Sequence, residues 1–262
     1  MKKKIFAVIL TLAMVGTMLG CGKGDTKSDM EYVRGNNKLV VGITDFAPMD
    51  YKDDNGNWIG FDADLAAAFA ERLGVEVEFV EVDWDNKVLE LDGNTVDCIW
   101  NGMTLTDEVK SAMACSNAYC NNSQIVIVPK EVADKYQTVD SLSELNFAVE
   151  AGSAGKEQAE ANGLSYTEVT NQAAALMEVQ AGTSDAAIID SLMAAAMVGE
   201  GTSYDELTYT VGLNSEEYGV GFRKGSDLVD ELNKFFVDSY NDGTMMKIAE
   251  EYGVQAAVVE QK

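Results

Sequence analysis

Short apolar segments alternate with helical segments along most of the chain, and this alternation restricts the fold more than any other feature. KLVVGIT at 38–44 is typical of a buried strand. DADLAAAFAERLG at 62–74 has apolar residues at helical spacing and a glycine that ends the helix. Strands are expected again at 75–82 and 95–100, with a short helix at 84–91 between them. Strand, helix and strand in this order predict a parallel sheet with crossover helices, an α/β fold.

The second half of the chain has the same order of elements without a strict sequence repeat. A strand is expected at 124–130, and the helix after it would begin at Asp140 or Ser141. Since open α/β sheets bind ligands beyond the carboxyl ends of their strands, residues 101–106 and 152–155 are expected to face each other across a ligand. The remaining elements are predicted as a strand–turn–helix unit at 146–160, strands at 167–170, 185–190 and 216–226, helices at 171–182 and 191–198, and two helices that are broken at Asp242-Gly243.

The first residues have the pattern of a secretory signal. Lys2, Lys3 and Lys4 precede an apolar run at 5–19, which is shorter than the ~20 residues of a membrane-spanning helix. The ending Met-Leu-Gly-Cys is similar to a bacterial lipobox, in which Cys21 is lipidated; an uncleaved anchor is the alternative. We therefore expect a signal peptide at 1–20 and a flexible tether at 21–37, which holds the protein at the extracellular face of the cell membrane. No later segment is long and apolar enough to cross a membrane.

Charge and residue types exclude several classes of function. The formal charge of −25 argues against binding of nucleic acid, whose phosphates require an excess of lysine and arginine. The chain has no histidine, which removes Ser-His and Cys-His catalysis and the usual zinc sites. We expect neither a cofactor nor a metal. Cys98, Cys115 and Cys120 are expected to be buried thiols, with one disulfide plus a free thiol as the alternative.

Six stretches of the chain occur in an order that is typical of one protein family. They are GFDADLAAAFAERLG, TVDCIWNGMTLT, EAGSAG, SDAAIID, EEYGVGFRKGS and NDGTMMKIAEEYG. They resemble the polar amino-acid type of solute-binding proteins of ABC importers, family 3. This resemblance implies a two-lobed periplasmic-binding-protein fold of type II, a Venus flytrap, which closes around a small ligand. Lobe 1 would hold residues 38–126 and 221–262, lobe 2 would hold 127–220, and the hinge would lie near 125–129 and 219–222.

The same resemblance implies which residues contact the ligand. Phe46 would stack its ring on the ligand, with packing in the core as the alternative, and Trp84 would line the same cleft. Ser153 lies in a turn before a helix whose N–H groups suit a carboxylate, with simple capping of that helix as the alternative. Asp190, at the end of an apolar strand, would receive the α-ammonium group of an amino acid. The loop NGMTLT would add contacts from Asn101, Gly102, Met103 and Thr104.

One residue departs from the family pattern at the position of a ligand-binding arginine. Relatives continue the loop as T-x-E-R, and this arginine holds the ligand carboxylate with two hydrogen bonds. Here Val109 occupies that position, and the side chain of Lys110 is turned about 100° away on the helix. None of the three arginines in the chain is expected to replace it. The predicted cleft therefore lacks the usual cation.

The expected ligand follows from the charge of this cleft. Glu150 and Asp45 would add negative charge beside the lobe 2 turn and beside Phe46. We expect a ligand that is richer in cation than in anion, such as an amine or a basic or modified amino acid. The alternative is an ordinary amino acid whose carboxylate is bound by N–H groups of Thr104 and Ser153.

The functional hypothesis is a tethered, monomeric receptor that captures a small amino acid or amine and delivers it to ABC permease subunits. Closure of the lobes would be a population shift between open and closed states. Two alternatives use the same scaffold. One is an enzyme that resembles cyclohexadienyl dehydratases, although the sequence shows no paired acid and base at recognisable spacing. The other is a ligand-sensing domain, although no output module follows.

Overall fold

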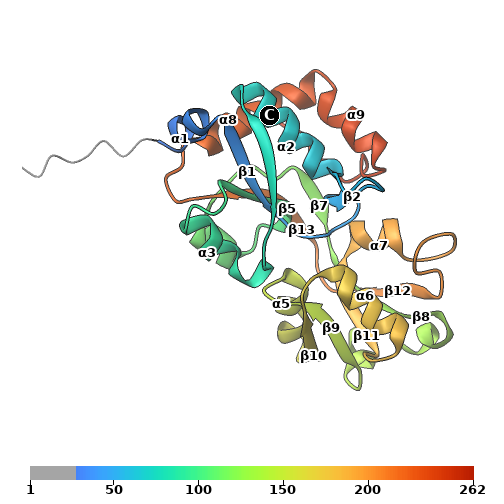
Figure 1. The fold of residues 1–262 in the computed structure, drawn as a ribbon. Helices are drawn as coiled ribbons and strands as arrows, with labels where there is room; N and C mark the ends of the chain where they lie inside the picture. Colours follow the sequence, from blue (N-terminus) through green and yellow to red (C-terminus); the bar gives the residue numbers. More distant parts are fainter. Residues whose placement is uncertain (1–27) are drawn as a thin grey trace, which may run out of the picture.

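The computed structural model describes residues 28–262, which form two α/β lobes, each built around one large sheet (Figure 1). The predicted signal peptide, Cys21 and the first part of the tether lie outside the described residues. No helix within residues 28–262 is long and apolar enough to span a bilayer. The two-lobed α/β fold that the sequence predicts is confirmed.

Lobe 1 contains a mixed sheet in the strand order β4-β1-β5-β13-β6, with β7 also paired to β13. The first three strands are parallel and β13 is antiparallel to β5. The strands are β1 (Lys38–Ile43), β4 (Glu76–Glu81), β5 (Cys98–Thr104), β6 (Ala114–Cys115), β7 (Cys120–Asn122) and β13 (Glu216–Phe222), and a small hairpin joins β2 (Tyr51–Lys52) to β3 (Trp58–Ile59).

The helices of lobe 1 pack on both faces of this sheet (Figure 1). They are α2 (Phe61–Leu73), α3 (Lys87–Asp92) after a 3₁₀ turn at Trp84–Asn86, α4 (Asp107–Ala112), α8 (Leu228–Asn241) and α9 (Thr244–Glu251). The predicted end of α2 is confirmed, because Gly74 has a left-handed backbone with φ 76° and its N–H group closes the last turn.

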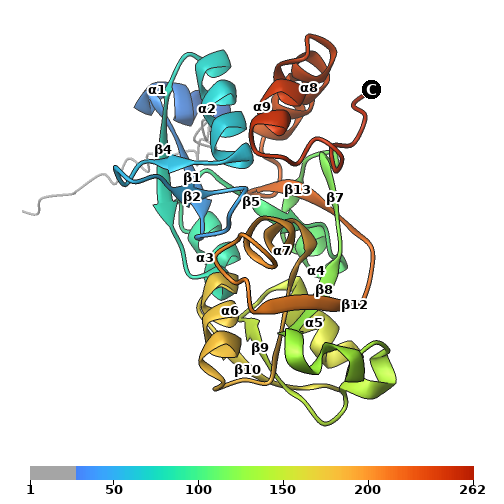
Figure 2. The ribbon, with the colours of Figure 1, turned by 90° about the vertical axis from the view of Figure 1, so that its right-hand side faces the viewer.

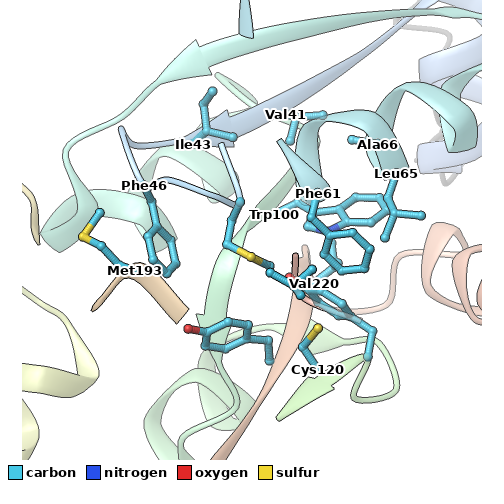
Figure 3. Packing of buried hydrophobic residues seen from close by; sticks show 14 of the residues in the cluster. Val41, Ile43, Phe46, Phe61, Leu65, Ala66, Trp100, Cys120, Met193 and Val220 are labelled. Carbon is cyan, nitrogen blue, oxygen red and sulfur yellow. The ribbon is translucent and has the colours of Figure 1, made fainter. Parts of the chain in front are cut away.

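The core of lobe 1 is aromatic and lies beside the strands that carry the site. Trp100 on β5 packs at ring-centroid distances of 5.6 Å from Phe236 and 6.3 Å from Tyr119. Figure 3 shows Trp100 close to Phe61 and Val220 in this core. Cys98 and Cys120 are buried and Cys115 is partly buried, all three as free thiols, so the prediction of thiols is confirmed and the disulfide alternative is wrong.

Lobe 2 contains a five-stranded sheet in the order β10-β9-β11-β8-β12. Two details differ from the sequence-based expectation. The segment after β8 forms 3₁₀ turns, of which the second is capped by Thr138 rather than by Asp140 or Ser141, and strand β12 at the sheet edge was not predicted. The elements are β8 (Gln124–Pro129), β9 (Asn146–Glu150), β10 (Ser165–Val169), β11 (Ala186–Asp190), β12 (Leu207–Gly212), α5 (Ala154–Ala161), α6 (Gln172–Ala181), α7 (Ser191–Met197), and 3₁₀ turns at Lys130–Lys135 and Val139–Leu142.

The chain passes between the lobes twice, at Ser123 and at residues 213–215 (Figure 2). All of β8 pairs within lobe 2, and all of β13 pairs within lobe 1. The predicted boundaries at 126/127 and 220/221, and the predicted hinge strands, therefore need correction: the crossings precede these two strands. An apolar run predicts a buried strand but does not indicate to which sheet it pairs.

The tether prediction is wrong for its last part, because residues 29–36 form helix α1 (Asp29–Asn36). Val33 on this helix is fully buried in the lobe 1 core. Asp29 forms an ion pair with Arg223 at 3.2 Å, and the backbone N–H of Met30 donates to Asp227 at 2.9 Å. The polar composition of the segment concealed a single valine and two charge contacts that attach it to the domain.

Candidate functional site

A cavity of about 230 Å³ lies between the lobes. Strand β5, the segment that follows β1, and helices α3 and α4 form one wall, and β9, β11 and the start of α5 form the other. The cavity is lined by nine of the ten residues that the sequence predicts as ligand contacts, namely Phe46, Trp84, Asn101, Gly102, Met103, Thr104, Glu150, Ser153 and Asp190.

Asp45 is the predicted contact that does not line the cavity. Its side chain is exposed, while Thr44 and Phe46 on either side of it do line the cavity. Successive side chains of an extended segment point in opposite directions, which turns Asp45 outward. The prediction of a ligand contact for Asp45 is therefore wrong.

Phe46 lies against the backbone of Gly102. The φ angle of Gly102 is +54°, and a Cβ atom there would lie 2.3 Å from Cε1 of Phe46. Only glycine permits this approach, both because of its backbone conformation and because of the space. Phe46 is 3% exposed, belongs to the core and also borders the cavity, beside Met193 of lobe 2 (Figure 3). Phe46 therefore packs in the core with part of its ring and borders the cavity as well, so the two alternatives for this residue do not exclude each other.

The segment predicted as a binding loop is the end of strand β5, since Asn101 to Thr104 all have strand geometry. The side chain of Asn101 accepts from the Thr44 hydroxyl at 2.7 Å and donates to Asp50 at 2.7 Å. The Thr104 hydroxyl donates to Glu216 at 2.9 Å. These bonds fix the wall of the cavity, and they leave the side chain of Asn101 little capacity for a ligand.

The lobe 2 turn comes close to the opposite wall. Gly152 has a φ of +66°, and a Cβ atom there would lie 2.7 Å from Cα of Asp85 in lobe 1. The hydroxyl of Ser153 accepts from the N–H of Lys156 at 3.2 Å, so it caps α5. The N–H groups of Ala154 and Gly155 have no acceptor within the helix, and this positive helix end suits an anion.

Asp190 is buried at the end of β11 and is surrounded by donors. It accepts from the Tyr218 hydroxyl at 2.8 Å and from Nε2 of Gln124 at 2.8 Å. The amides of Asn122 and Gln172 also donate to it. Burial raises the pKa of Asp190 to about 7, and the carboxylate of Glu216 adds to this effect. Sequence reasoning missed these partners because they come from four separate elements.

Glu150 is 3% exposed and lines the same cavity. Burial, followed by the nearby carboxylate of Asp190, raises the pKa of Glu150 to about 8, although the ammonium group of Lys87 opposes the rise. Its Oε1 atom has no hydrogen-bond partner within residues 28–262. A buried carboxylate without a partner is costly, so Glu150 suits a ligand cation.

Lys87 is a cavity residue that sequence reasoning missed. It is 8% exposed, and its ammonium group donates to the carbonyls of Gly152 at 2.8 Å and Trp84 at 3.1 Å. The ammonium group also lies 5.0 Å from the centre of the Trp84 ring. The expectation that the cleft lacks a replacement cation therefore needs correction. The available signal was the spacing of three residues from Trp84, which places both on one helical face.

The cavity as a whole is acidic. Val109 lines it and Lys110 does not, as predicted. A second lysine, Lys156, borders it but pairs with Glu168 at 2.8 Å. No cluster of three or more possible metal ligands occurs in the part of the chain that the structure describes. The acidic residues of the lining are Asp85, Glu108, Glu150, Glu157, Glu160 and Asp190.

Comparisons with known proteins agree with this architecture. The profile of the bacterial extracellular solute-binding proteins, family 3, matches residues 39–255. The arginine-binding extracellular protein ArtP of Bacillus subtilis is 28% identical over 259 residues, which are 95% of this chain and 98% of that protein. An ABC uptake transporter substrate-binding protein from Streptococcus pneumoniae, solved with bound histidine, is 30% identical with a TM-score of 0.80, covering 88% of this chain and 98% of that one.

A reconstructed protein gives a further comparison. The ancestral amino acid-binding protein AncCDT-1, described as a precursor of cyclohexadienyl dehydratase, is 31% identical with a TM-score of 0.79. The match covers 86% of this chain and 99% of the ancestral chain. This relative of a dehydratase is thus itself described as a protein that binds an amino acid.

Proposed function

Because the chain belongs to the bacterial extracellular solute-binding proteins of family 3, we propose that it captures an amino acid or a related small amine between its lobes. It delivers this ligand to the permease subunits of an ABC importer. The observation that carries the proposal is the cavity between the lobes, which two buried carboxylates, Glu150 and Asp190, line together. Buried carboxylates require partners, and a ligand cation supplies one to each.

The charge of the cavity favours a ligand with more cation than a neutral amino acid carries. Val109 occupies the position of the family's carboxylate-binding arginine, and the lining contains more acidic than basic residues. The arginine-binding and histidine-bound relatives support a basic ligand. We propose that the protein acts as a monomer, attached through a lipid on Cys21 at the extracellular face of the membrane.

Binding without turnover is part of this proposal. Glu150 and Asp190 are both buried, and amide and hydroxyl donors hold Asp190 in place, which suits retention of a cation. The dehydratase alternative has no specific support in the cavity. Incubation with prephenate or arogenate should therefore leave both compounds unchanged, and formation of an aromatic product would contradict the proposal.

Thermal-shift screening followed by calorimetry tests the ligand class. The panel contains basic, neutral and acidic amino acids together with their decarboxylated analogues. We expect basic members to raise the melting temperature most, because the lining of the cavity is acidic. A ligand at 100 times its Kd stabilises a protein by about 2.7 kcal/mol, which is a measurable shift. A preference for acidic or neutral amino acids would contradict the charge argument. Failure of every amino acid and amine to bind would contradict the proposed function itself.

A further inference from the structure

We propose that Lys87 binds the carboxylate of the ligand and thereby replaces the arginine that Val109 displaces. This inference rests on the proposed function and deepens it, because it defines the ligand as a carboxylate-bearing amino acid with a cationic end. Three features of the cavity support it: the free donor of Lys87, the wall on which Lys87 lies, and the helix N–H groups on the opposite wall.

The ammonium group of Lys87 retains one unused donor. A lysine has three N–H bonds, and two of them are directed to the carbonyls of Gly152 at 2.8 Å and Trp84 at 3.1 Å. No acceptor for the third occurs in the described part of the chain. Lys87 is 8% exposed and lines the cavity, so this donor is available to an acceptor inside the cavity.

Lys87 lies on the wall that the missing arginine would have occupied. Its ammonium group is 5.0 Å from the ring centre of Trp84. Trp84 and Val109 belong to the same hydrophobic cluster, and both line the cavity. A lysine on the first turn of α3 therefore delivers positive charge to the region where the family's arginine is absent.

The opposite wall provides further donors for an anion at the same place. Because Lys87 bonds to the carbonyl of Gly152, its ammonium group lies beside the turn that leads into α5. The first N–H groups of this helix, at Ala154 and Gly155, have no intrahelical acceptor. A carboxylate between Lys87 and the start of α5 would receive a full charge from one lobe and helix N–H groups from the other.

Glu150 provides the complementary group for a ligand cation. It lies within electrostatic reach of both Asp190 and Lys87, although it forms no ion pair with Lys87 in the described structure. Its Oε1 atom has no hydrogen-bond partner within residues 28–262. A ligand that offers a carboxylate to Lys87 and one or two cationic groups to Glu150 and Asp190 complements the cavity. A basic α-amino acid has this distribution of charge.

Lys87 also forms a contact between the lobes, and the test has to separate this contact from ligand recognition. Loss of the hydrogen bond to Gly152 would weaken closure and would reduce the affinity for every ligand by the same factor. Loss of a carboxylate contact would affect only ligands that have a carboxylate. The ratio of affinities for an amino acid and its decarboxylated analogue removes the effect of closure.

Calorimetry with the probe pairs L-arginine and agmatine, and L-histidine and histamine, provides this ratio. The wild type is compared with Lys87→Met and Lys87→Arg. For Lys87→Met we expect the ratio of amino-acid to amine affinity to fall by about 30-fold or more, since truncation of one partner of a buried charge pair costs about 2 kcal/mol or more. Lys87→Arg should recover a large part of the ratio. Lys110→Met is the matched control, because it removes the same charge from lobe 1 at an exposed position outside this cavity.

Two outcomes would overturn the inference. One is an unchanged ratio in Lys87→Met, whether both affinities fall by the same factor or neither changes; an equal fall would reduce Lys87 to a contact for closure. The other is a wild type that binds the amines but not the amino acids. Each of these outcomes leaves the proposed function intact, whereas binding of no probe and of no other amino acid or amine would contradict that function. Circular dichroism of each variant verifies that it is folded.

Discussion

At the scale of single residues, the site depends on a glycine in β5 as much as on its charged side chains. We expect Gly102→Ala to weaken ligand binding and to lower the free energy of unfolding by more than about 1–2 kcal/mol, the cost of a left-handed backbone for an L-residue. The additional loss comes from the contact with Phe46, which a Cβ atom would meet at 2.3 Å. Urea unfolding and calorimetry measure both effects.

Gly56→Ala is the matched control for this prediction. Gly56 also has a positive φ, of 83°, but a Cβ atom added there would have no neighbouring atom within 4 Å, so the substitution introduces strain without a clash. Gly102→Ala should therefore cost more than Gly56→Ala. Equal costs would show that the contact between Phe46 and residue 102 has no part in the effect.

Asp190 has a structural role in addition to the expected ligand contact. We expect Asp190→Ala to abolish binding and also to lower the free energy of unfolding by about 1–3 kcal/mol for each buried donor that it leaves unsatisfied. Those donors include the hydroxyl of Tyr218 and the amide of Gln124. Urea unfolding and calorimetry of the same preparation provide the test. Unchanged affinity would remove Asp190 from the ligand site.

Residues that line the cavity could be predicted from the sequence where they belong to a motif of the family. Lining residues outside such motifs could not be predicted. Glu150 and Asp190 end strands, so their places at the cavity follow from the topology of an α/β sheet. Lys87 has no such marker, because a lysine on a short helix usually lies in solvent. Its burial results from the approach of Gly152, which belongs to the other lobe. A contact of this kind between distant segments has no local signal.

At the scale of elements, helix α1 belongs to lobe 1. We expect Val33→Ala to lower the free energy of unfolding by about 1–3 kcal/mol, since it leaves a small cavity in a packed core. Val33 has no exposed surface, whereas Tyr32 beside it is 41% exposed. Tyr32→Ala is therefore the control and should have little effect. Equal stability of the two variants, measured in urea, would mean that α1 does not contribute to the domain.

The elements were predictable to different degrees, and the differences have physical reasons. Helix α2 has a clear apolar period and a glycine at its end, so both its existence and its end at Gly74 could be predicted. The lobe to which β8 and β13 belong could not be predicted from the sequence, because it depends on their pairing with distant strands. Helix α1 was missed because one buried valine in a polar segment gives no periodic pattern.

At the scale of the whole molecule, burial of carboxyl groups makes stability depend on pH. Burial raises the pKa of Asp62 and of Asp190 to about 7 and that of Glu150 to about 8. Unfolded carboxyl groups have pKa values near about 4. The folded protein therefore binds these protons more tightly than the unfolded chain, and their stabilising effect is lost as pH rises through the folded pKa values.

We accordingly expect the free energy of unfolding, measured without ligand, to decrease between about pH 5 and about pH 8. Urea unfolding curves across this range measure the slope. Glu150→Gln should reduce the slope, because the amide does not titrate. A flat or rising profile would contradict the predicted effect of these buried acids.

The two lobes are also joined by hydrogen bonds at the chain crossings. The amide of Asn122 donates both to Asp190 in lobe 2 and, at 2.7 Å, to Glu216 at the start of β13. Gln124 makes the same pair of contacts at 2.8 Å each. Asp190 is thus linked through two amides to residues beside both points where the chain passes between the lobes. A ligand that changes the charge of Asp190 would alter these hydrogen bonds, at the place where the lobes move relative to each other.

On the proposed function, the raised pKa of Glu150, about 8, makes the binding of a cation an exchange of one ion for another. A cationic ligand beside Glu150 favours its carboxylate form, so binding below about pH 8 should release a proton to the medium. Binding should therefore weaken at acidic pH and strengthen at alkaline pH. Calorimetry with L-arginine in buffers of different ionisation enthalpy counts the released protons. Glu150→Gln should release fewer, and an unchanged count in that variant would assign the exchange to another group.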